Sequence, residues 1–289
     1  MSANPEDPLA GYVGHLTPEQ EQVLSQLKSE LQNEGWFFPK RHDDPNLLRF
    51  LRDRKFDLAG SKKMILACEE WRKEFGVDNI VNNSNLSEKS ELRKYYPQYF
   101  HKTDKDGRPL YIERFAIGDA KALGGMTEEK QLHNFVNELE RLLYERLPAC
   151  SAAAGRPVEN MCAILDLKGG NPLDFFKVTG YVFKVCEIAQ KYYVGCLDRL
   201  YVINSPSHSN RVAVKALELV KTRVDDVAFA RFIILDSNYK KTLLEQIPID
   251  NLPTDFGGAC SCPGGCAFSD PGPWNDDDKY KDLAKSTTR

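Results

Sequence analysis

Apolar residues recur with a helical period near the start of the chain. Thr17 stands where a helix cap is expected, Pro18 follows as the first helical residue, and Gln20 takes the third position of a capping box. Apolar side chains then return every three or four residues until Gly35, a typical helix end. The pattern predicts one amphipathic helix whose buried stripe comprises Val23, Leu24, Leu27 and Leu31.

Two further helices are expected before residue 90. One begins with Asp44 as cap and Pro45 as first residue and continues through "LLRFLRDRKF". The next covers residues 58–75 and places one apolar face at helical spacing, formed by Met64, Ala67, Trp71 and Phe75. Residues 16–90 are therefore predicted to form a small helical domain, after an N-terminal extension over residues 1–15.

The pattern changes to strands in the second part of the chain. Asp106-Gly107 is a tight-turn dipeptide, and "PLYIERF" after it alternates as a strand does. A long helical pattern runs from Thr127 to Leu147, where Pro148 is expected to end it. Three nearly continuous apolar runs follow at helix-length intervals, "MCAILDL", "RLYVINS" and "ARFIILD". Such runs predict an α/β domain with a buried, largely parallel sheet over residues 91–275, followed by a tail over 276–289.

Composition narrows the classes of partner. The chain has 289 residues, of which 42% are hydrophobic, and its net charge of −3 gives no basic field for nucleic acid. No signal peptide and no apolar window of about 18 residues is found, so we expect neither secretion nor a membrane span. Five of the eight cysteines are scattered singly through apolar segments, as in proteins of a reducing compartment: Cys68, Cys150, Cys162, Cys186 and Cys196. We therefore expect a cytoplasmic protein.

No catalytic or nucleotide-binding motif accompanies the predicted sheet. The sequence contains no G-x-G-x-x-G, no P-loop and no G-x-S-x-G. Its five histidines form no set with an acid and a nucleophile: His15, His42, His101, His133 and His208. The sequence therefore predicts no enzyme, no resident cofactor and no catalytic residue.

Five segments, in order, resemble one protein family. They are residues 44–78, 95–114, 146–169 and 200–206, and "LLEQIPIDNLPTDFGG" followed by "GPW". Together they are similar to the CRAL-TRIO lipid-binding proteins, and among these to the Sec-fourteen-like phosphatidylinositol/phosphatidylcholine transfer proteins of fungi and plants. The resemblance implies a sheet that floors an apolar lipid pocket, closed by a mobile gate helix.

The resemblance also implies an activity. A monomer would carry one phospholipid and exchange it, with a second hydrophobic lipid, between membranes. It would contact membrane surfaces transiently, at the Golgi, the endoplasmic reticulum or other membranes. Such a carrier needs concealed apolar surface rather than a catalytic set, because burial of each CH₂ group is worth about 0.8 kcal/mol.

The same resemblance assigns residues to the headgroup of phosphatidylinositol. It places Arg54 and Lys55 at the inositol phosphate, and Arg231 where the family has a lysine. A guanidinium and an ammonium are good phosphate donors. The family's glutamate is replaced by Gly195 and a threonine by Ala228. From the residues alone, a solvated basic helix end is the favoured interpretation of this pair.

The family's choline site is altered. A serine and a threonine that contact its phosphate correspond to Met161 and Ala163, and two of its tyrosines to Phe100 and Leu139, while Tyr111 is retained. An unpaired phosphate would be costly beside these apolar side chains. The substitutions therefore favour a largely apolar second ligand, such as a sterol or squalene, with neutral variation of the pocket wall as the alternative.

A second class of function stays open. The protein could be a non-transferring carrier or sensor of another hydrophobic ligand, such as a sterol, squalene, a fatty acid or haem. Tyr111, Tyr192 and Tyr193 are candidate haem ligands, because tyrosine can bind haem iron.

Two more segments carry expectations. The predicted gate, residues 204–232, keeps an apolar stripe of Val212, Ala216, Leu217 and Val220. Near the C-terminus, "GGACSCPGGCAF" offers Cys260, Cys262 and Cys266 but no fourth ligand at zinc spacing, since the nearest histidine along the chain is His208. We therefore expect a packing role and no metal, with a metal site or a redox-sensitive thiol cluster as alternatives.

Overall fold

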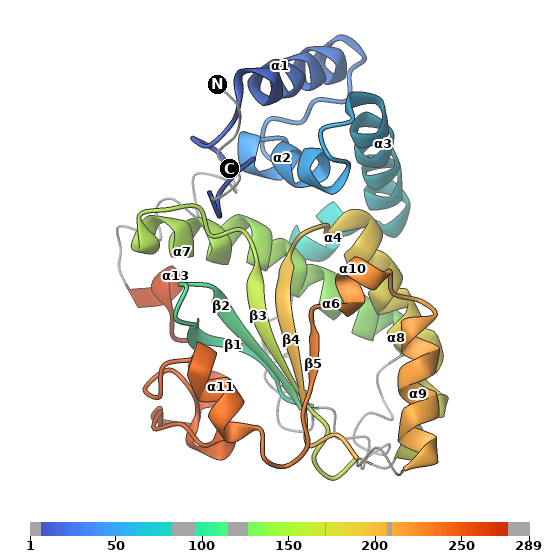
Figure 1. Cartoon of the computed structure of the whole chain (residues 1–289). Coiled ribbons are helices and arrows are strands. Elements are labelled where there is room, and N and C mark those ends of the chain that lie inside the picture. The colour runs from blue at the N-terminus through green and yellow to red at the C-terminus, as the bar shows by residue number, and fades with distance from the viewer. Residues whose placement is uncertain (1–6, 83–95, 115–126, 171, 207–209, 277–289) are drawn as a thin grey trace.

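A small helical unit lies on one end of a larger α/β domain (Figure 1). The computed structural model describes residues 7–82, 96–114, 127–170, 172–206 and 210–276. The helical unit consists of α1 (Pro18–Asn33), α2 (Asp44–Asp53), α3 (Leu58–Phe75) and α4 (Val77–Asn82). This arrangement confirms the predicted order of a helical domain before an α/β domain.

The helix caps follow the sequence, with one correction. The Gln20 amide donates to Thr17 Oγ1 at 3.3 Å, the Thr17 amide donates to Gln20 Oε1 at 3.0 Å, and Gly35 has a φ of 76° just after the helix. The predicted cap of α2 is wrong by one residue. Asp43 is the cap because its backbone is extended and its carboxylate accepts from the amide of Asn46 at 3.0 Å.

The buried face of α3 also differs from the prediction. Its covered residues are Ser61, Ile65, Cys68, Glu69 and Arg72, whereas Ala67 is exposed and Met64, Trp71 and Phe75 are half-buried. Glu69 can be buried because Arg41 and His42 pair with its carboxylate, and Arg72 because it pairs with Glu140. A prediction from apolar spacing leaves out such charged residues.

The α/β domain is built on a five-stranded sheet in the order β1-β2-β3-β4-β5. β1 (Gln98–Thr103) and β2 (Pro109–Arg114) form an antiparallel hairpin, whose turn contains Asp106 and Gly107 as predicted. The three predicted apolar runs are β3 (Met161–Asp166), β4 (Leu197–Ile203) and β5 (Phe232–Ile234), which continue the sheet in parallel.

Different segments of the chain cover the two faces of the sheet. The connecting helices lie on one face: α6 (Glu128–Arg141), α7 (Leu147–Ala154), α8 (Pro172–Tyr192), α9 (Arg211–Lys221) and α10 (Asp226–Phe229) (Figure 1). This placement follows from right-handed crossovers between sequential strands. The other face is covered by α11 (Lys240–Gln246) and by the segment that contains η2 (Thr254–Phe256) and α12 (Cys266–Ser269). The last helix, α13 (Pro273–Asp276), contacts α7.

Pro148 does not end a helix, contrary to the prediction. Between α6 and α7 the chain makes one π-helical turn, η1 (Leu142–Arg146), in which the amide of Leu147 donates to the carbonyl of Leu142. Pro148 then falls in the first turn of α7, where its missing N–H costs nothing. The π-turn thus lets the chain continue as a helix through the proline.

Candidate ligand-binding site

The helix-covered face of the sheet retains accessible apolar surface. The strand registers place Leu165, Leu200, Val202, Phe232 and Ile234 side by side on this face, and all five are only half-buried; together we call them the apolar floor. Their neighbours on the opposite face, Ile164, Tyr201 and Ile203, have at most 2% of their surface exposed. The covering helices therefore do not seal this part of the sheet.

The helices beside the apolar floor are incompletely buried as well. α8 and α9 pack together, and their apolar residues are mostly half-buried. The stripe predicted for the gate lies on α9, with Ala216 buried and Val212, Leu217 and Val220 half-buried. The apolar character of the gate is confirmed, while its motion stays a prediction.

A polar group faces the same side of the sheet near β1. The hydroxyls of Tyr96 and Tyr111 both donate to the carboxylate of Glu113, the latter at 3.2 Å. Burial raises the pKa of both tyrosines and of Glu113, yet all three keep accessible surface. The three side chains are thus partly accessible polar groups on the helix-covered face of the sheet. The sequence analysis missed Glu113, although it lies two residues after Tyr111 and so shares its face.

Basic side chains gather at the other end of the apolar floor. Arg54 caps the C-terminus of α2 with half of its side chain exposed, and Lys55 follows it. Arg231 directly precedes β5, and its guanidinium donates to the carbonyl of Leu197. Burial raises the pKa of Asp53, and the charges of Arg54, Asp225 and Arg231 lie close enough to shift it. Arg54 and Arg231 thus both lie near Asp53, while their role at a headgroup stays a prediction.

The backbone at this basic end is strained. Lys55 and Phe56 have φ angles of 52° and 62°, in the left-handed region. The amide of Phe56 closes the turn by donating to the carbonyl of Leu51 at 2.7 Å. Each non-glycine residue in this region costs about 1–2 kcal/mol of conformational free energy. Such strain marks the turn as a candidate functional element.

Relieving this strain should stabilise the protein. Lys55→Gly should raise the free energy of unfolding by about 1 kcal/mol, because glycine adopts the left-handed conformation without penalty. The matched variant Lys55→Ala removes the same charge but keeps the strain, so it should show no such gain. Urea denaturation of both variants measures the difference, and equal stability of the two would contradict the interpretation.

Comparison with known proteins identifies the family. Residues 20–67 match the CRAL/TRIO N-terminal domain, and residues 93–258 match the CRAL/TRIO domain. The chain belongs to the CRAL/TRIO family. The Sec14 cytosolic factor of Schizosaccharomyces pombe is 46% identical over 275 residues, which cover 95% of this chain and 94% of that protein.

A plant relative and a solved structure agree with this assignment. The phosphatidylinositol/phosphatidylcholine transfer protein SFH11 of Arabidopsis thaliana is 39% identical over 265 residues, covering 90% of this chain and 69% of its own. The crystal structure of Sfh5 is similar in fold, with a TM-score of 0.64 at 14% identity, over 93% of this chain and 96% of that one. Among the helices described for this CRAL/TRIO protein, none is long and apolar enough to cross a membrane.

The residues expected to replace the family's choline site form one apolar cluster. Phe100, Leu139, Tyr111 and Met161 pack together, and Ala163 lies beside Tyr111 in the strand register. Phe100, Leu139 and Ala163 are covered, while Tyr111 and Met161 keep accessible surface. In this CRAL/TRIO domain the site is therefore a packed wall, whose polar atoms come from Tyr111 and Glu113.

The tyrosines considered as haem ligands have separate partners in the CRAL/TRIO fold. The ring of Tyr192 stacks on Trp71 with centroids 4.1 Å apart, and the hydroxyl of Tyr193 donates to Glu140 at 2.6 Å. Tyr111 instead donates to Glu113. The stacking of Tyr192 on Trp71 joins the helical unit to the larger domain, and nothing in the contacts of these tyrosines favours an iron site.

Proposed function

We propose that this protein binds one glycerophospholipid, phosphatidylinositol in the first place, and exchanges it between membranes. The observation that carries the proposal is the continuity of the apolar floor with the basic end. Arg231 directly precedes Phe232 of the floor, and its carbonyl accepts from the amide of Leu200, another floor residue, at 2.9 Å. A lipid with its headgroup at Arg54, Lys55 and Arg231 would lay its acyl chains along the floor.

The chemistry of the lipid headgroup and of its acyl chains supports this orientation. Charge-assisted hydrogen bonds from a guanidinium and an ammonium suit a phosphate, and each contributes about 1.5–3 kcal/mol. Acyl chains covered by the floor and by α8 and α9 gain about 0.8 kcal/mol per buried CH₂ group. The proposal includes no chemical step and no resident cofactor apart from the bound lipid.

The second ligand is proposed to be a hydrophobic lipid. Phe100, Leu139 and Ala163 in the packed wall carry no hydroxyl for a phosphate, and the hydroxyl of Tyr111 already donates to Glu113, which supports a sterol or squalene. Glu113 and the tyrosines around it are the polar alternative, since a carboxylate and aromatic rings attract a choline cation. Lipid analysis of the purified protein distinguishes the two.

Membrane contact is proposed to be transient and made by a monomer. Exposed apolar side chains at the start of α8 and on α10 support such contact, namely Leu173, Phe176 and Val227. The relatives named cytosolic factors support a place of action in the cytosol, at the surface of the Golgi, the endoplasmic reticulum or other membranes.

Charge reversal at the basic end tests the headgroup assignment. The double variant Arg54→Glu/Lys55→Glu should lower phosphatidylinositol transfer between vesicles at least tenfold, because two phosphate donors become repulsive carboxylates. Lys40→Glu/Lys73→Glu, at two exposed lysines of the same domain, changes the net charge equally and should transfer normally. Undiminished transfer by the folded Arg54/Lys55 variant would discard the assignment.

A further inference from the structure

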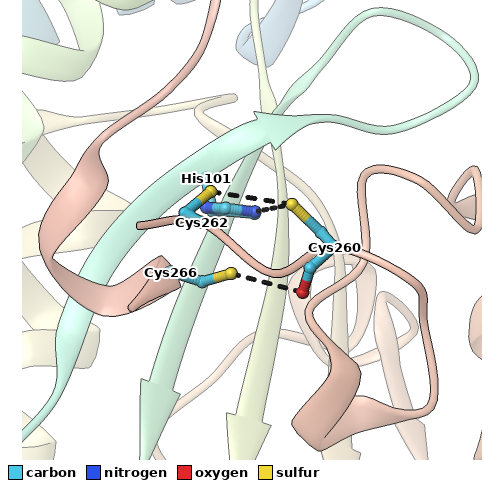
Figure 2. Close-up of side chains that lie close together, drawn as sticks. All are labelled: His101, Cys260, Cys262 and Cys266. Atoms are coloured by element: carbon cyan, nitrogen blue, oxygen red, sulfur yellow. Dashed lines mark hydrogen bonds between the residues drawn. The ribbon is translucent and has the colours of Figure 1, made fainter. Parts of the chain in front are cut away.

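Four side chains with metal-binding atoms meet on the sheet face opposite the apolar floor (Figure 2). His101 projects from β1, and Cys260, Cys262 and Cys266 come from the C-terminal segment. One ligand atom of each lies within 4.8 Å of the other three. His101 and Cys260 are buried, and 159 residues separate them along the chain.

The distances are close to those of a tetrahedral zinc site. Zn–S bonds of about 2.3 Å and a Zn–N bond of about 2.0 Å place neighbouring sulfur atoms about 3.8 Å apart and nitrogen about 3.6 Å from sulfur. Cys260 Sγ lies 3.7 Å from Cys262 Sγ and 3.3 Å from His101 Nε2. Small side-chain movements would therefore suffice to surround one ion.

A backbone turn brings the cysteines close together. Cys262, Pro263, Gly264 and Gly265 form a turn in which the amide of Gly265 donates to the carbonyl of Cys262 at 2.9 Å. Proline at the second position and glycine with a φ of 77° at the third are typical of a type II turn. The turn brings Cys266 back beside Cys260, whose carbonyl lies 3.5 Å from Cys266 Sγ.

The histidine supplies a second, independent observation. His101 has 0% of its surface exposed, and its Nδ1 finds no hydrogen-bond partner of normal geometry among the described residues. Its other ring nitrogen, Nε2, faces the sulfur of Cys260 at 3.3 Å. Nε2 is thus the atom of His101 that could bind a metal together with the thiols.

We propose that His101, Cys260, Cys262 and Cys266 hold one structural Zn²⁺ ion. Three thiolates and one imidazole suit zinc, a soft ion that accepts tetrahedral geometry. On binding, each of the three thiols releases its proton to solvent and its sulfur forms one bond to the ion. His101 binds through Nε2 and keeps the proton on Nδ1, toward the carbonyl of Cys266. Four protein ligands leave no open position, so the site has no catalytic role.

The position of the site indicates what it stabilises. β1 is an edge strand, and the cysteine segment is part of the cover over the outer face of the sheet. A shared ion would fasten this cover to β1. The spacing of the cysteines along the chain could not disclose the site, because its fourth ligand lies on a strand that the sequence analysis did not identify.

Metal analysis tests the proposal. The full chain, expressed with zinc in the medium and purified with a reductant and without chelators, should contain about one zinc per molecule. Cys262→Ser should lower this content at least tenfold, whereas Cys186→Ser, at a half-buried cysteine of α8, should retain it. A zinc-free parent protein, or a Cys262→Ser variant with undiminished zinc, would overturn the proposal.

A second measurement does not depend on the folding of a variant. The parent protein, stripped of metal under reducing conditions and titrated with Co²⁺, should develop the absorption of a tetrahedral cobalt–thiolate site and saturate near one equivalent. Removal of the metal should lower the melting temperature, and zinc should restore it. If cobalt gives no thiolate bands, or if thiol mapping finds a Cys260–Cys262 disulfide that binds no metal after reduction, the cluster is only a packed group of thiols.

Discussion

Replacing Arg72 with methionine should lower the free energy of unfolding by about 3–5 kcal/mol, the cost of breaking a buried ion pair. Arg72 on α3 donates to both carboxylate oxygens of Glu140 on α6, at 2.6 and 2.9 Å, and only 8% and 4% of the two side chains are exposed. Burial alone would lower the pKa of Arg72. The ion pair with Glu140 raises it by a larger amount, so the pKa lies above its ordinary value and the guanidinium stays charged. Methionine would leave the carboxylate of Glu140 buried without its guanidinium partner, although the hydrogen bond from the Tyr193 hydroxyl would remain.

A double variant distinguishes the stability lost with the ion pair from the stability lost with side-chain packing. Arg72→Met/Glu140→Gln removes both charges and keeps an acceptor for the Tyr193 hydroxyl, so it should be more stable than Arg72→Met alone by about 2 kcal/mol. Chemical denaturation of the two variants and the parent gives these values. A loss below about 1 kcal/mol in Arg72→Met would mean that water reaches the carboxylate, so that the helical unit is not fastened to the larger domain by this pair.

The second large effect concerns the apolar floor. Val202→Trp should lower the lipid content of the purified protein at least tenfold, because the indole would fill the space proposed for the acyl chains. Val202 is half-buried at the centre of the floor, between Leu165 and Ile234 in the strand register. The larger ring can therefore extend on the side where Val202 keeps accessible surface.

Val202→Leu is the matched control. It keeps an aliphatic side chain at the same position and should bind lipid as the parent does. Phosphorus analysis of the protein extract measures occupancy, and circular dichroism checks that both variants are folded. Normal occupancy in folded Val202→Trp would place the ligand elsewhere in the fold.

Much of the fold could be predicted because its signals are local. Thr17 and Gln20 specify the first helix through a capping box that spans four residues, and the apolar runs of β3 to β5 identify a buried sheet directly. The role of the basic end stays a prediction. There the resemblance named Arg54, Lys55 and Arg231, and the structure brings Arg54 and Arg231 together around Asp53.

Features that depend on distant partners could not be predicted. Ion pairs with residues distant in the sequence bury Glu69 and Arg72, so apolar spacing left these two out of the buried face of α3. The π-turn that accommodates Pro148 has no sequence signal of its own. Likewise, Glu113 and His101 acquire their importance from neighbours that only the folded sheet brings near them.

The most direct test of the proposed function is the identity of the bound lipid. Native mass spectrometry of the parent protein from a eukaryotic host, followed by organic extraction, should find one lipid per chain and phosphatidylinositol in the extract. That result would mean that Arg54, Lys55 and Arg231 suffice for the headgroup although Gly195 replaces the family's glutamate. An extract that contains only a sterol, squalene or a pigment would contradict the account.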